Sequence, residues 1–105
     1  MYDLAILGGG PAGVAAGVYA SRKRLKTIFI TDSWGGQSVD SMGVENWIGT
    51  VKIPGPELAE ALKSHLMAYA GDIVDVRENE RVTKIAKNDE QGGVFKIETS
   101  KGSYE

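Results

Sequence analysis

A glycine-rich turn near the start of the chain constrains the fold more than any other feature. Gly8–Gly13 has the pattern G-x-G-x-x-G. It follows a short apolar run at residues 2–7 and precedes residues 11–24, which are rich in small residues compatible with a helix. A second apolar and β-branched run at residues 27–31 completes a strand, helix, strand unit. This order predicts an α/β fold built on a parallel sheet.

The residues of this turn have separate expected roles. Gly8 permits the tight turn, Gly10 lacks the Cβ that would keep a pyrophosphate away from the backbone, and Gly13 lets the helix lie close to the strand. Pro11 suits the first helical position, where its missing N–H costs nothing. The first helical turn, which includes Ala12, offers unpaired N–H groups and a partial positive charge to a diphosphate. The pattern therefore predicts a dinucleotide site, and no Gly-Lys-Ser/Thr sequence follows that would indicate a mononucleotide loop.

An acidic residue about twenty positions after such a turn is expected to bind the ribose. Asp32 lies at that distance, at the end of the second predicted strand. Thr31 is the alternative, because Asp32 can also simply begin the following turn. The sequence leaves the choice between the two open.

The middle of the chain is predicted to be one long connection followed by a helix. Residues 32–53 contain scattered glycines and show no sustained period, yet Trp34 and Trp47 argue against disorder. A helix is expected from Pro56, with apolar residues at three- and four-residue spacing and Gly71 as its C-terminal stop.

The last third of the chain is rich in strand-forming residues. Residues 73–76 predict a third short strand, and residues 81–87 and 94–99 predict an antiparallel hairpin around a glycine-containing turn. Residues 103–105 resemble the beginning of a further strand. We therefore expect a Rossmann-like parallel sheet plus an antiparallel hairpin or meander.

Composition excludes several classes of function. The chain of 105 residues has no cysteine, which rules out an internal redox disulfide or a thiolate metal site, and no metal-binding residues are predicted. Twelve Lys and Arg against fourteen Asp and Glu give no basic surface for nucleic acid. The apolar start of the chain carries Asp3 where a signal peptide would be positive, so we expect a cytoplasmic protein that does not enter a membrane.

Beyond the glycine turn, several short motifs occur in the order found in one family. Read together, they resemble the FAD domain of low-molecular-weight thioredoxin reductases and the wider group that includes alkyl hydroperoxide reductase flavoproteins and thioredoxin-reductase-like ferredoxin reductases. The resemblance runs through essentially the whole chain. The motifs are YDLAILGGGPAGVAAGVYASRKRLKT, Gly35-Gly36-Gln37, Val44-Glu45-Asn46-Trp47, Gly55-Pro56-Glu57-Leu58 and Gly92-Gly93-Val94-Phe95.

The resemblance implies FAD as the cofactor. It places the FAD pyrophosphate at Gly8–Gly13 and the adenine at the backbone around Val82. Gln and Asn suit the flavin side because each offers a donor and an acceptor without adding charge beside a redox ring. The flavin-side residues implied by the family are Gly35, Gly36, Gln37, Ser41 and Asn46.

The resemblance further implies an NAD(P)H-dependent flavin oxidoreductase that passes electrons through FAD to a disulfide or a small redox protein. Residues 1–105 would form a single incomplete domain, because a doubly wound fold needs more parallel strands, and no second glycine pattern for NADPH or NADH is present. No residue is predicted to be catalytic, and the chain alone is expected to bind FAD weakly and to be inactive. The complete enzyme is expected to be a homodimer that acts with a thioredoxin-like or ferredoxin-like protein. A ferredoxin or flavodoxin reductase without a redox disulfide and a non-catalytic nucleotide-binding module remain alternatives.

Overall fold

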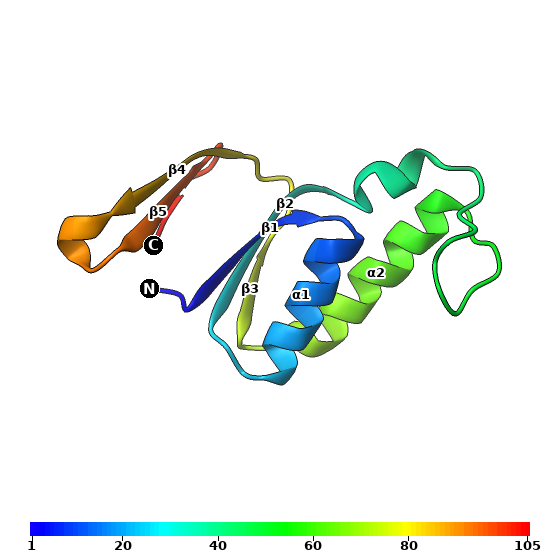
Figure 1. Ribbon diagram of the computed structural model, residues 1–105, viewed down its shortest axis with the longest axis horizontal. Helices are drawn as coiled ribbons and strands as arrows, with labels where there is room; N and C mark the ends of the chain where they lie inside the picture. Colours follow the sequence, from blue (N-terminus) through cyan, green and yellow to red (C-terminus); the bar gives the residue numbers. More distant parts are fainter.

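The computed structural model describes all residues 1–105 and contains three layers (Figure 1). Two helices cover one face of a parallel sheet, and a small antiparallel sheet packs on residues of the other face. Figure 1 shows the antiparallel sheet extending away from the helices, with the two chain termini close to each other. The predicted fold class is confirmed.

The parallel sheet has the strand order β1-β2-β3, and a helix connects each strand to the next. Its strands lie in register from one end, where Leu4 and Val74 flank the first residue of β2 on either side. The elements are β1 (Leu4–Gly9), α1 (Pro11–Arg22), β2 (Thr27–Trp34), α2 (Gly55–Ala70) and β3 (Val74–Arg77).

Two boundaries differ from the predicted ones. Helix α1 ends at Arg22 rather than Arg24, because Arg24 has a left-handed φ of 59° and the chain turns there toward β2. Strand β2 extends to Trp34, whereas the sequence predicted that the irregular connection begins at Asp32. The extension is paired with β1, since Trp34 lies opposite Gly9 after a shift in register.

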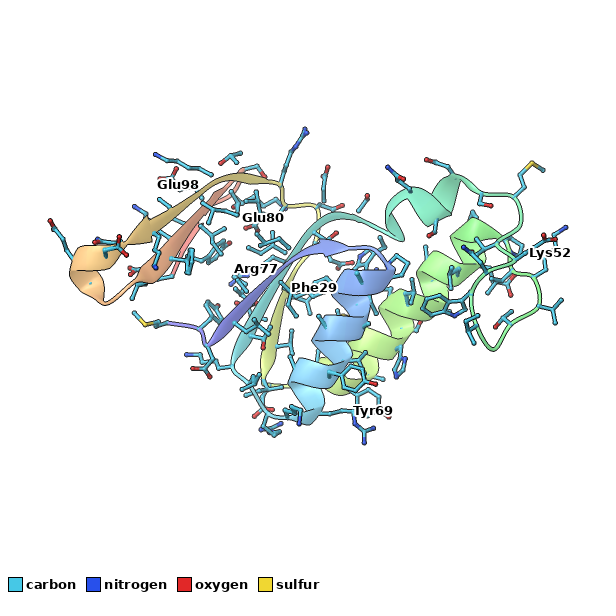
Figure 2. The ribbon with its side chains drawn as sticks, viewed as in Figure 1. Phe29, Lys52, Tyr69, Arg77, Glu80 and Glu98 are labelled. Carbon is cyan, nitrogen blue, oxygen red and sulfur yellow. The ribbon has the colours of Figure 1, made fainter.

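Alternate residues of β2 supply two separate hydrophobic cores. Phe29 is fully buried and faces the helices, where it packs with Leu58 and Leu66. Ile28 and Ile30 face the other way and pack with residues of the antiparallel sheet, which include the buried Ile97. Figure 2 shows Phe29 on the side of α1 and α2, and Glu80 on the side of the antiparallel sheet. The period of two along β2 therefore holds the three layers together.

The antiparallel sheet confirms the predicted hairpin. Its strands are β4 (Val82–Asn88), β5 (Val94–Thr99) and β6 (Ser103–Tyr104), in the order β4-β5-β6. A short 3₁₀ turn, η2 (Asp89–Gln91), and two glycines with positive φ connect β4 to β5. Strand β6 is the further strand expected near the end of the chain.

The connection between β2 and α2 is ordered by local packing. It contains a 3₁₀ turn, η1 (Gly36–Asp40), and a bridge between Val44 and Ile53. Trp34 stacks on Phe29 with ring centroids 5.5 Å apart, and Trp47 packs against the core between helices and sheet. Both tryptophans thus anchor this connection to the sheet and helices. Neither helix has the length and apolar character needed to cross a bilayer.

Candidate functional site

The turn between β1 and α1 presents an uncapped helix N-terminus. Gly10 is the N-cap residue, with φ −78° and ψ −176°, and no side chain caps the helix. Pro11 occupies the start of the helix, and the first backbone hydrogen bond runs from Val14 N to Gly10 O at 3.0 Å. Because the N–H groups of a first helical turn have no intrahelical acceptor, Ala12 and Gly13 are placed to donate to an anion.

The glycines of the turn differ in what surrounds them. A Cβ on Gly13 would lie 1.8 Å from the carbonyl oxygen of Gly8, so α1 can approach β1 only with glycine here. Gly8 has a φ of 113°, which also favours glycine. A Cβ on Gly10 would meet nothing closer than the Cα of Gly36 at 3.7 Å. Gly13 is therefore required by packing within the chain, whereas the open side of Gly10 is available to a ligand.

Gly9 has a structural role that the sequence motif did not predict. A Cβ on Gly9 would lie 2.6 Å from Thr31 Oγ1 and 2.9 Å from the carbonyl oxygen of Ser33. Thr31 is 3% exposed, and its hydroxyl donates to that same Ser33 carbonyl. The adjacent Asp32 is exposed. Since the Thr31 hydroxyl is used inside the strand, the geometry favours Asp32 over Thr31 for a contact with a ribose.

The second group of predicted glycines lies directly against the first. Gly35 N donates to Gly9 O at 2.9 Å, and both Gly35 and Gly36 have positive φ, at 90° and 56°. A Cβ on Gly36 would lie 3.3 Å from the Cα of Gly10. Two segments far apart in the motif pattern thus form one backbone-lined corner at the N-terminus of α1.

A polar hollow follows this corner along η1 and the next loop. Its volume is about 510 Å³. Ser41 O accepts a hydrogen bond from Gly55 N at 2.8 Å, which fixes the hollow to the start of α2. A Cβ on Gly55 would collide with the carbonyl oxygen of Ser38, so this glycine also shapes the site. The hollow is lined by Gln37, Ser38, Ser41, Gly43, Val44, Glu45 and Asn46, which include the three polar residues expected on the flavin side.

Val82, the residue expected near adenine, begins β4 and is half-buried. Two residues earlier, Glu80 N donates to Thr31 O at 3.1 Å. This bond brings the start of β4 to the end of β2, beside Asp32. The expected adenosine contacts therefore gather at the end of β2, and the expected flavin contacts gather around η1.

The end of β2 is also held by an ion pair. Trp34 Nε1 and Lys63 Nζ each donate to Glu78 Oε1 at 2.8 Å. The hydrogen bond from Lys63, with that from Trp34, lowers the pKa of the Glu78 carboxyl, so Glu78 stays ionised in this contact.

The chemistry of the site is that of a binding surface. Among the residues expected to contact the cofactor, Asp32 alone carries an ionisable side chain. The other contacts are backbone N–H groups, amides and a hydroxyl, which suit a phosphate chain and the polar edges of a ring system. No group of three or more His, Cys, Asp or Glu side chains is placed to hold a metal ion.

Comparison with known sequences finds relatives among oxidoreductases. No protein-family model matches the chain. The F component of alkyl hydroperoxide reductase from Escherichia coli is 38% identical over 102 residues, which cover 97% of this chain and 19% of that protein. NADH dehydrogenase of Bacillus subtilis is 36% identical over 104 residues, covering 93% of this chain and 20% of that protein.

Solved structures show the same fold. Thioredoxin reductase of Lactococcus lactis matches 99% of this chain with a TM-score of 0.86 and 31% identity. Thioredoxin reductase of T. acidophilum matches 98% with a TM-score of 0.82 and 33% identity. The chain spans about a fifth of the length of the curated relatives and about a third of the length of these reductases.

Proposed function

Because this chain is homologous to part of the FAD-dependent pyridine nucleotide-disulfide oxidoreductases of the thioredoxin reductase type, we propose that it forms the FAD-binding part of an NAD(P)H-dependent flavin oxidoreductase. The observation that carries the proposal is the corner between Gly10 and Gly36. There, an uncapped helix N-terminus faces a side of Gly10 that is free of side chains.

In this proposal each group of residues holds one part of the cofactor. The N–H groups of Ala12 and Gly13 donate to the pyrophosphate, and the open side of Gly10 lets the phosphates reach them. Asp32 accepts from the ribose, and the backbone around Val82 contacts adenine. Bound FAD supplies the redox chemistry, whereas these residues supply position and electrostatics. The flavin-side contacts come from Gly35, Gly36, Gln37, Ser41 and Asn46.

We propose that the enzyme carries electrons from NADPH or NADH through FAD to a disulfide of a thioredoxin-like protein. The names of the solved neighbours and of the alkyl hydroperoxide reductase relatives support this order of transfer. A cytoplasmic homodimer is the proposed form. A ferredoxin-like acceptor is the alternative, and reduction assays that supply each acceptor to the enzyme would separate the two.

The binding proposal is tested by exchanging Gly10 for alanine. Gly10→Ala fits its surroundings, because its φ is ordinary and the nearest atom to the new Cβ lies 3.7 Å away. The new methyl group would still stand where the phosphates approach. We expect FAD and ADP to perturb the NMR signals of the Ala12 and Gly13 amides in the parent chain, and we expect affinity for both ligands to fall by at least about tenfold in Gly10→Ala, which corresponds to about 1.4 kcal/mol.

The matched control is Gly102→Ala, at a glycine whose new Cβ would have its nearest neighbour 3.6 Å away. This variant adds the same methyl group outside the corner and should bind as the parent chain does. Parent protein whose Ala12 and Gly13 amides do not respond to FAD or ADP, or a Gly10→Ala variant that binds both ligands normally, would refute the proposed site.

A further inference from the structure

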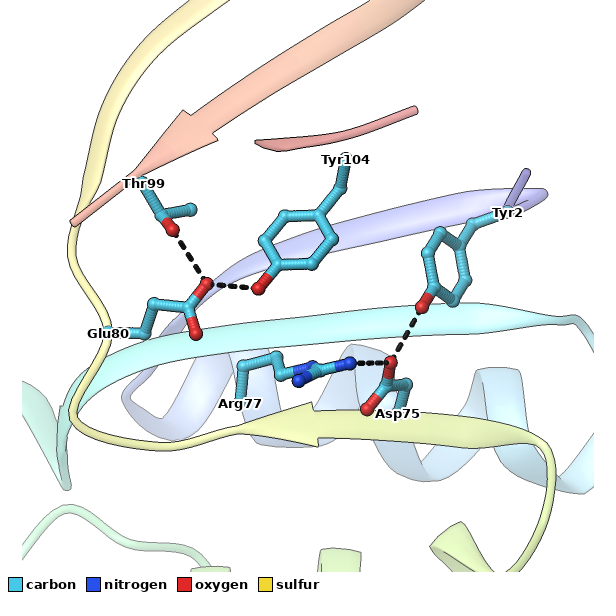
Figure 3. Close-up of polar contacts among 6 residues, drawn as sticks. All are labelled: Tyr2, Asp75, Arg77, Glu80, Thr99 and Tyr104. Carbon is cyan, nitrogen blue, oxygen red and sulfur yellow. Dashed lines mark hydrogen bonds and ion pairs between the residues drawn. The ribbon is translucent and has the colours of Figure 1, made fainter. Parts of the chain in front are cut away.

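Glu80 is the one charged side chain in the protein that is buried. It lies between β3 and β4 and is 2% exposed. Burying a carboxylate is costly unless hydrogen bonds compensate for the lost water. Thr99 Oγ1 and Tyr104 Oη each donate to Glu80 Oε2 at 2.7 Å (Figure 3). The side chain therefore fastens its own segment to β5 and β6.

The backbone of the same segment is fastened on both sides. Glu80 N donates to Thr31 O of β2 at 3.1 Å. Arg81 N donates to Ser100 Oγ at 3.1 Å, and Ser100 N donates to Arg81 O at 2.9 Å. Glu80 and Arg81 thus connect the end of the parallel sheet to the antiparallel sheet.

The surroundings keep Glu80 charged. Burial by itself raises the pKa of a carboxyl, but the hydrogen bonds from Tyr104 and Thr99, together with the charges of Arg77 and Lys101, bring the pKa of Glu80 below its ordinary value. The Arg77 guanidinium lies 5.5 Å from the centre of the Tyr104 ring. Figure 3 shows Arg77 between Glu80 and Asp75, to which it donates.

We infer that Glu80 is a positioning residue that sets the adenosine end of the proposed FAD site by fixing the start of β4 against the end of β2. This inference rests on the proposed function. Asp32 follows Thr31, whose carbonyl accepts from Glu80 N, and Val82 follows Arg81, so both expected adenosine contacts adjoin the bonds described above.

The pyrophosphate and flavin sides are held by other contacts. Gly35 N bonds to Gly9 O, and Gly55 N bonds to Ser41 O, without any participation of the antiparallel sheet. Loss of the Glu80 carboxylate should therefore weaken one end of the site and leave the other end unchanged. A residue that only supported the overall fold would affect both ends equally.

The experiment compares ligands that represent the two ends of FAD. Glu80→Gln keeps the size of the side chain but removes its charge, and Tyr104→Phe removes one of the two donors from the opposite side. NMR titrations with ADP, FMN and FAD then give an affinity for each ligand. We expect both variants to bind ADP and FAD about tenfold more weakly than the parent, and FMN within about twofold of it.

Glu98→Gln is the matched control, because it makes the same chemical change in the same sheet at a carboxylate that no hydrogen bond to Glu80 or its partners involves. It should leave all three affinities at the parent level. Equal losses for ADP and FMN, or unchanged ADP binding in both Glu80→Gln and Tyr104→Phe, would overturn the inference while leaving the proposed function intact. A parent chain that binds none of the three ligands would overturn the proposed function and the inference together.

Discussion

Gly13→Ala tests how closely α1 must approach β1. Alanine at this helical position would gain about 1 kcal/mol from helix propensity. Against that gain, the new Cβ would be built 1.8 Å from the Gly8 carbonyl oxygen, a separation that real Cβ atoms do not show. The two effects have opposite signs, so their sizes decide the outcome.

The steric cost is the larger effect, because the obstructing atom belongs to the backbone. The gap must widen by more than about 1 Å to reach the 3.0 Å at which such contacts begin to occur. Gly8 cannot move aside easily, since the neighbouring Gly9 accepts a hydrogen bond from Gly35 and pairs with Trp34. Helix α1 would have to move instead, which loosens Val14, now 2% exposed. Forced overpacking costs about 1–3 kcal/mol or more, so we expect a net loss of about 2 kcal/mol.

Gly17→Ala serves as the control on the same helix. Its new Cβ would lie 2.7 Å from Leu66 Cδ1, the end of a side chain that can turn, and 3.3 Å from the Phe29 ring. The helix-propensity gain should offset this smaller cost, leaving stability within about 1 kcal/mol of the parent.

Urea unfolding followed by circular dichroism measures both variants. For a chain of this size a loss of about 2 kcal/mol lowers the unfolding midpoint by about 1–2 M urea. Stability of Gly13→Ala equal to or greater than that of Gly17→Ala would refute the steric reasoning.

Two further predictions concern the cores and the charges between the sheets. Phe29→Ala removes a fully buried ring that stacks on Trp34, so it should cost about 3–5 kcal/mol and lower the urea midpoint, with loss of the buried Trp34 signal in fluorescence as the check. Burial raises the pKa of Asp75 and of Glu80, but hydrogen bonds and nearby positive charge lower both net values in the folded state. The unfolded chain therefore binds protons more tightly at these two carboxyls, so their stabilisation is present above their ordinary values of 3.8 and 4.5 and is lost as the pH falls through the lowered folded values. Urea midpoints measured from pH 7 to pH 3 should fall less steeply in the double variant Asp75→Asn, Glu80→Gln than in the parent, and parallel curves would contradict the assignment.

Sequence patterns predicted those parts of the fold that local signals determine. Gly8–Gly13 between an apolar run and a small-residue run predicted β1 and α1, and the apolar spacing before Gly71 predicted α2. The end of β2 was missed, because Asp32 and Ser33 are polar and resemble a turn. Their strand conformation depends on pairing with β1, which lies at the other end of the unit in sequence.

The site was predicted as a set of residues, but their arrangement was not. Nothing in the pattern distinguishes Gly10, which faces open space, from Gly9, which accommodates the Thr31 hydroxyl. Glu80 lies in a charged segment that would normally be exposed, and its two donors, Thr99 and Tyr104, are about twenty residues away in the chain. Contacts of that separation have no local signature.

The alternation of β2 explains why the two ends of the proposed cofactor site should respond to different mutations. Phe29 faces the helices, so the packing that fixes α1 and the pyrophosphate corner depends on the core shared with Leu66. Ile28 and Ile30 face the antiparallel sheet, so the position of β4 at the adenosine end depends on the separate core that includes Ile97. A substitution in one core reaches the other only through the backbone of β2, which is paired on both sides and therefore stiff. Ile97→Ala should for that reason resemble Glu80→Gln in its effect on ADP binding more than it resembles Phe29→Ala.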